Sequence, residues 1–159
     1  MNKLALAVAT LSLIIACSKP QPAQPGPQAP TPTAREPTVD PRSSAAAEEL
    51  VRSFAALLNT GRSDEAYMLL GPSAPPRKSF DAGFARLRHL QVTVGHAGDQ
   101  EGAAGSIYVS VPLTVSGRAD GKRMSRSAKA VLRRVNDVPG STEAQRHWHI
   151  ERIDWQPMA

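Results

Sequence analysis

SIYVSVPLTVS, residues 106–116, is the stretch that decides the fold, because apolar and polar residues alternate along all of it. Every second position is aliphatic: Ile107, Val109, Val111, Leu113 and Val115. This period of two predicts a β-strand with one face in the core and the other exposed. Proline has no amide hydrogen to donate. We therefore expect this strand at a sheet edge, or with the nitrogen of Pro112 directed away from the neighbouring strand.

Further strands are predicted on both sides of this stretch. One precedes it at 90–94 and is followed by a glycine-rich connection. The dipeptide Asp120-Gly121 favours a tight hairpin turn into a strand at about 124–135, and a last strand is expected over 147–155.

The last strand changes parity along its length. Ile150 has one parity, whereas Ile153 and Trp155 have the other. A β-bulge restores a common face by inserting one extra residue. We expect that bulge near Glu151 or Arg152.

The region before the strands has the apolar spacing of helices. The first helix is predicted to have Ser43 or Ser44 as its cap and to end at Asn59-Thr60-Gly61. Two shorter helices follow, over 63–70 with Ser63 as its cap and over 80–90 with Ser79 as its cap.

Three N-terminal helices followed by four antiparallel strands predict an α+β domain over 43–159, with the helices on one face of the sheet. This order resembles the nuclear transport factor 2-like superfamily, also called cystatin-like or SnoaL-like. The likeness is strongest over 54–70, where a helix ending in LLNTG is followed by DEAYMLL. The resemblance implies a curved, cone-like sheet around the long helix and a pocket between them, with a wall that includes Val92, Val109 and Val111.

The N-terminus has the layout of an export signal. Lys3 precedes an uncharged apolar run, and small Ala16 stands before Cys17, the single cysteine of the chain. This arrangement resembles a bacterial lipoprotein precursor, which implies removal of 1–16 and acylation of Cys17 as the new N-terminus and membrane anchor. The alternatives are an ordinary signal peptide cut nearby and an uncleaved anchor helix.

A proline-rich stretch separates this segment from the predicted domain. Residues 17–42 contain many prolines and almost no large apolar residues, which is typical of a disordered, extended tether. Binding to an aromatic groove is the alternative role for such a tract. Ser18, rather than aspartate, follows the cysteine, and in the lipoproteins that this chain resembles this implies the outer membrane, facing the periplasm. A Gram-positive cell surface is the alternative.

Positive charge is concentrated in the predicted hairpin. The chain carries a formal net charge of +5, and the only acidic residue between positions 118 and 134 is Asp120. Such a segment favours an acidic protein or anionic headgroups as partner. The alternative is a solvated, charge-protected sheet edge. Nucleic acid is disfavoured, because no aromatic residues are interleaved with the charges. The basic residues are Arg118, Lys122, Arg123, Arg126, Lys129, Arg133 and Arg134.

Catalysis is not predicted. The strand positions expected to face inward carry no acid, and helix capping explains Asp64 beside Tyr67. His147, His149 and Glu151 share one parity, which is an arrangement that metal ligands adopt on a strand. We expect these three to face solvent instead, while Trp148 and Ile150 face the core. His89 and His96 stand alone in sequence. We expect no cofactor and no metal.

Two functions from different classes follow. The first is a non-catalytic module of the cell envelope that binds another envelope protein or forms a homodimer, with an inhibitor or immunity protein as one form of it. The second is a carrier or sensor of a small apolar ligand in the cone. A cavity of at least about 300 Å³ behind the sheet would favour the second function.

Overall fold

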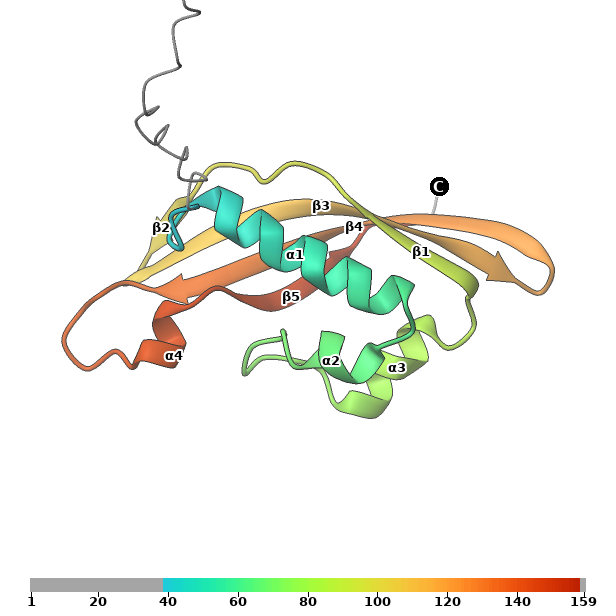
Figure 1. The fold of residues 1–159 in the computed structure, drawn as a ribbon, viewed down its shortest axis with the longest axis horizontal. Coiled ribbons are helices and arrows are strands. Elements are labelled where there is room, and N and C mark those ends of the chain that lie inside the picture. The colour runs from blue at the N-terminus through green and yellow to red at the C-terminus, as the bar shows by residue number, and fades with distance from the viewer. Residues whose placement is uncertain (1–38, 158–159) are drawn as a thin grey trace, which may run out of the picture. The chain divides into compact units, whose positions relative to one another are not determined.

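The fold is organised around β3 (Ser106–Ala119), which contains the alternating stretch and continues beyond it. A computed structural model describes residues 39–157 of the chain, and it has an α+β fold with an antiparallel sheet, as predicted (Figure 1). The predicted signal segment, Cys17 and nearly all of the proline-rich stretch lie outside the described residues. No helix within the described residues is long and apolar enough to cross a bilayer.

The sheet has the strand order β1-β3-β4-β5, with β2 paired to β3 beyond the end of β1. The strands are β1 (Arg88–Val94), β2 (Glu101–Ala103), β4 (Lys122–Val135) and β5 (His149–Trp155). β2 was not predicted, because three exposed residues inside a glycine-rich connection give no readable period.

β3 is a central strand, so the edge position expected from Pro112 is wrong. The second expectation holds instead. The carbonyl of Pro112 accepts a hydrogen bond from the amide of Gly95 (2.9 Å), which lies just past β1. The nitrogen and carbonyl of one strand residue point to the same side. The nitrogen of Pro112 therefore points away from β4 and toward Gly95, where β1 has already ended.

The bulge in β5 is confirmed. Leu132 pairs with Ile150, but the next residue of β4, Val131, pairs with Arg152, so Glu151 is the extra residue. This insertion places Ile153 and Trp155 on the same face as Ile150, and all three pack against the core.

α1 (Ser44–Asn59) covers one face of the sheet and supplies five of the sixteen buried residues of the core. Ser43 caps it by accepting a hydrogen bond from the amide of Ala46 (3.2 Å). Its apolar stripe is buried against the inward positions of the strands. The largest fully buried side chains are Phe54, Leu132, Ile150, Val51, Val109 and Val111.

The shorter helices differ from the prediction. α2 (Ser63–Tyr67) begins with Ser63 inside the helix, so Ser63 is not its cap, and it ends three residues early. α3 (Arg77–Phe84) starts after Pro76, not at Ser79, and stops before Arg86. α4 (Glu143–Arg146) was missed, although Thr142 and Gln145 form a capping box there.

Both outer edges of the sheet are partly covered. The side chain of Asn59 accepts from the amide of Val92 (2.7 Å) and donates to its carbonyl (3.1 Å), as a neighbouring strand would. At the other edge, Ile150 donates to Leu69 (3.1 Å) and accepts from Gly71 (2.9 Å). These contacts protect the edges from pairing with other chains.

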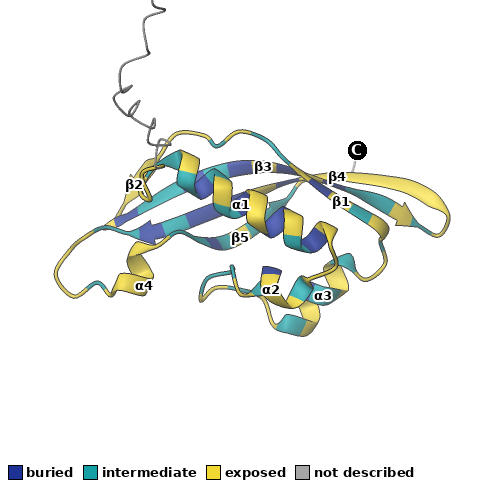
Figure 2. Ribbon diagram, viewed as in Figure 1, coloured by how far each residue is buried: buried dark blue, intermediate teal, exposed yellow. Residues whose placement is uncertain are grey.

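The β3–β4 hairpin extends past the core at one end of the sheet. Asp120 and Gly121 have positive φ angles of 49° and 75°, which is the geometry of a type I′ turn and confirms the predicted hairpin. Figure 2 shows this end of the hairpin as largely exposed, in contrast to the buried middle of both strands.

Candidate interaction surface at the hairpin

The seven predicted basic residues of the hairpin lie on both faces of the sheet. Arg126 pairs with buried Val115, so it belongs to the inner face, together with Lys122 and Arg134. The other four point outward: Arg118, Arg123, Lys129 and Arg133. They do not form one continuous patch.

Three of these arginines are held by aromatic rings. Arg126 lies 5.0 Å from the ring centroid of Trp155 and Arg134 lies 5.8 Å from that of Trp148. Arg133 lies 6.0 Å from Tyr108 and donates to the hydroxyl of Ser106 (3.1 Å). Stacking on an aromatic face stabilises a guanidinium where it is. We assign these three side chains to the fold.

The exposed end of the hairpin holds a row of three arginines. The strand register places Arg118 opposite Arg123 on β4 and opposite Arg88 on β1. All three side chains are exposed. We call Arg88, Arg118 and Arg123 the arginine row.

Two open hollows flank this row. One has a volume of about 890 Å³ and is lined by Arg86, Arg88 and Arg118 among others. The other has a volume of about 750 Å³ and is lined by Arg118 and Arg123. Arg118 and His89 line both hollows, so the row is accessible from either side.

Like charges placed directly across strands repel one another. Ala119 and Lys122 close the two-residue turn as a hydrogen-bonded pair, and Arg118 and Arg123 form the next pair along the strands. That next pair exchanges no backbone hydrogen bonds, and in such pairs the side chains lie closer together. Within the described residues, Arg118 donates to the carbonyl of Gly121 (2.9 Å), and Asp120 lines the hollow beside it. No ion pair neutralises the row in the part of the chain that the structure describes.

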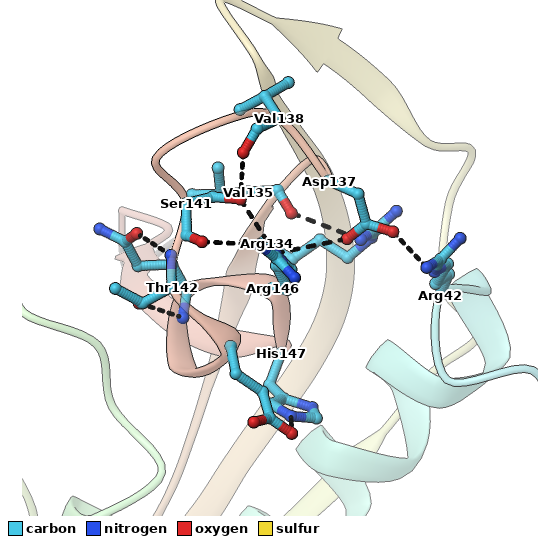
Figure 3. A network of polar contacts seen from close by, with 11 residues as sticks. Arg42, Arg134, Val135, Asp137, Val138, Ser141, Thr142, Arg146 and His147 are labelled. Atoms are coloured by element: carbon cyan, nitrogen blue, oxygen red, sulfur yellow. Dashed lines mark hydrogen bonds and ion pairs between the residues drawn. The ribbon is translucent and has the colours of Figure 1, made fainter.

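Other arginines of the domain are paired with acids. Arg77, for example, binds Asp81 (2.9 Å) and also contacts Asp64. At the end of the sheet opposite the hairpin turn, Figure 3 shows Arg42 and Arg146 both directed at the carboxylate of Asp137. Six arginines among residues 39–157 have such carboxylate partners: Arg42, Arg52, Arg62, Arg77, Arg146 and Arg152.

Sequence reasoning missed Arg88 as a member of this surface. The third helix predicted from the sequence, over 80–90, includes Arg88. α3 instead ends at Phe84, and Arg88 begins β1. His89, with a positive φ of 52°, lies where the β1–β3 register shifts. A strand assignment from 88 onward would have paired Arg88 with the hairpin.

The predicted pocket wall lies inside the core. Val92, Val109 and Val111 are between 0% and 4% exposed and pack against the core. A cleft of about 400 Å³ does lie farther along the inner face, lined by Leu87, Val115, Met124, Arg126 and Trp155 among others. A second cleft, of about 290 Å³, separates α3 from β5 and is lined by Phe80, Phe84, Glu151, Ile153 and Trp155 among others.

His149 and Glu151 do not face solvent as expected. Their side chains are 18% and 15% exposed, and they contact each other (3.0 Å). Burial tends to raise the pKa of Glu151, but hydrogen bonds from Ser73 (2.6 Å) and His149 outweigh it and hold that pKa below its usual value. Glu151 is therefore an ionised group that fixes the loop of Ser73 to β5.

The remaining candidate residues are dispersed. His147 is exposed and faces Glu143 (4.0 Å), and His96 lies 3.6 Å from Glu48. The hydroxyl of Tyr67 donates to the carbonyl of Pro75 (2.9 Å). Among residues 39–157, no group of three His, Cys, Asp or Glu side chains is placed to hold a metal ion.

No protein-family model matches the chain, and no curated protein matches it.

Proposed function

We propose that this chain is a lipid-anchored protein of the bacterial cell envelope whose folded domain is a non-catalytic protein-interaction module. The signal-like segment 1–16 and Cys17 support the anchor, and Ser18 supports the outer membrane, facing the periplasm, as its location. The proline-rich stretch then holds the domain away from the bilayer, because residues 18–41 reach at most roughly 75 Å at about 3.1 Å per residue. A cone-like, nuclear transport factor 2-like curvature of the sheet is part of this proposal.

The arginine row carries the proposal. Three exposed, mutually repelling charges at the end of a hairpin are unfavourable for folding by themselves. Binding sites commonly sacrifice stability in this way. An acidic surface on another envelope protein would remove the repulsion, because guanidinium groups bind carboxylates through two parallel hydrogen bonds. The same surface suits an inhibitor or immunity protein.

Photo-crosslinking in the host cell tests this function. Ser125 lines the hollow beside Arg123 and is replaced by a photoreactive amino acid in the full-length chain. We expect one discrete crosslinked protein, which disappears when Arg118 and Arg123 are changed to glutamine. Lys78→Gln combined with Lys129→Gln, an equal loss of charge outside the arginine row, should leave the crosslink intact. A crosslink that survives loss of both arginines, or no crosslink at all, would contradict the proposal.

The inner-face cleft supports a second candidate function, the carrier or sensor of a small apolar ligand. Its volume of about 400 Å³ and the side chains of Leu87, Val115 and Trp155 suit such a molecule. Native mass spectrometry of the chain from its host would reveal the ligand as a discrete added mass. The added mass should be lost when Val115 is replaced by Phe to fill the cleft. If the parent chain from its host carries no added mass, this candidate function is contradicted.

A further inference from the structure

We infer that the arginine row docks on an acidic stripe along one α-helix of the partner, with Asp or Glu at positions i, i+4 and i+7 of that helix. This inference rests on the proposed function and specifies its partner. The argument depends on the spacing of the row, on the neutral side chains beside it and on the room around it.

The row runs across the strands, not along one of them. Arg88, Arg118 and Arg123 occupy consecutive strands at one register position. Neighbouring strands are about 4.8 Å apart, so the three residues span roughly 10 Å in a line. A flat anionic surface would be matched better by charges spread in two directions.

The rows next to it are uncharged. One step toward the core on the same face, the same three strands carry Gln91, Ser116 and Ser125. The following row on β1 and β3 is Thr93 opposite Thr114. The two rows nearest the arginine row therefore carry no charge, and the next positive charge of the hairpin on this face is Lys129, three rows away on β4. The adjacent row offers neutral hydrogen-bonding groups.

An α-helix presents acids with matching spacing. Residues i, i+4 and i+7 share one face, and at 1.5 Å per residue they span about 10.5 Å. Carboxylates at alternate positions of a β-strand are roughly 6.7 Å apart and span about 13 Å, which fits the row less well. A helix lying across the strands would place one carboxylate opposite each guanidinium, with its flanks over the two hollows.

Asp120 provides an internal check on this docking mode. Its carboxylate lines the hollow that holds Arg88 and Arg118, where it repels an incoming acid. Asn-Gly suits a type I′ turn as well as Asp-Gly does. Asp120→Asn therefore preserves the hairpin and should tighten binding, a gain that misfolding cannot imitate.

The test uses the full-length chain in nanodiscs of neutral phosphatidylcholine. Two fluorescent helical peptides of identical composition are titrated by anisotropy, one with Glu at i, i+4 and i+7 and the other with Glu at i, i+2 and i+5. We expect the striped peptide to bind roughly tenfold more tightly, a difference of about 1.4 kcal/mol. Arg118→Gln should weaken it by a similar factor, Asp120→Asn should strengthen it a few-fold, and Lys129→Gln should leave it unchanged.

The outcomes separate this inference from the proposed function. Equal binding of both peptides that still depends on Arg118 would overturn the helical stripe and leave an acidic partner in place. No binding of either peptide, with the crosslink at Ser125 retained, would also overturn the stripe alone. Absence of both would overturn the two proposals together. Loss of peptide binding when phosphatidylglycerol is added to the discs would assign the row to an anionic membrane and overturn the protein partner.

Discussion

The two ends of the β3–β4 hairpin differ in whether their arginines have carboxylate groups as partners. Where β4 ends, the loop that leads to α4 surrounds its arginines with acceptors: Arg146 reaches Asp137 and donates to Ser141 (2.9 Å), and Arg42 meets the same Asp137 (Figure 3). At the turn, the arginine row faces solvent with Asp120 as its nearest acid in sequence.

This difference separates residues that hold the fold from residues that are displayed by it. At the loop end Asp137 and Ser141 bind the arginines around them, and the aromatic rings of Trp155 and Trp148 hold two further arginines in place. Nε of Arg134 and Nε1 of Trp148 are buried there without a hydrogen-bond partner within residues 39–157. The turn end lacks such carboxylate and aromatic partners among the described residues, so its charges are available to another molecule. Mutations should therefore affect stability at one end and binding at the other.

The largest expected effect on stability is in the buried middle of β4. Leu132 is 0% exposed and packs in the core, so Leu132→Ala should lower the free energy of unfolding by about 3 kcal/mol. Met124, on the same face of the same strand but 41% exposed, is the matched control, and Met124→Ala should cost less than about 1 kcal/mol. Urea denaturation measures both, and equal losses would contradict the division between the two regions.

A smaller effect is expected at the edge of β1. Asn59→Ala removes both hydrogen bonds to the backbone of Val92 and should cost about 1 to 2 kcal/mol. Asn59→Asp keeps the acceptor for the amide of Val92 but loses the donor to its carbonyl. The free energy of unfolding of this variant should therefore lie between that of the parent and that of the alanine variant. If Asn59→Ala leaves urea denaturation unchanged, the side chain does not act as a substitute strand.

The smallest effect on stability is a dependence on pH through Glu151. Its pKa is lower in the folded chain than its usual value of 4.5, so its contribution is present above that pH and is lost as pH falls through the lower folded pKa. Glu151→Gln should therefore flatten the stability curve below about pH 4.5. Thermal denaturation over this range measures the effect, with Ser79→Ala as an unrelated control on α3. If Glu151→Gln loses stability below this pH as steeply as the parent does, the contact between Glu151 and Ser73 does not contribute to the stability of the fold.

Local pattern predicted most of the fold. The alternation in β3, the Asp120-Gly121 turn and the parity change at Glu151 each act within a few residues, so the sequence exposes them directly. β2 and α4 are too short to have a period. The third helix was misplaced because Pro76 starts it and because the positive φ of His89 lies in β1, where no pattern marks it.

The candidate site was predicted only in part. Arg118 and Arg123 were identified from the hairpin, but Arg88 joins them through a register between strands that lie far apart in sequence. In the same way, Arg126 and Trp155 meet only in the folded sheet. The sequence shows which residues carry charge, but whether a charge is paired depends on residues that come close only in the folded chain.

The most direct test of the account is the free energy of unfolding of the full-length chain with Arg88, Arg118 and Arg123 all changed to glutamine. We predict a value equal to that of the parent or a few tenths of a kcal/mol higher, with the difference reduced by added salt, because repulsion across the strands is removed. A loss of more than about 1 kcal/mol, the size of a typical structural mutation, would show that these arginines hold the hairpin together, and it would contradict their assignment to binding.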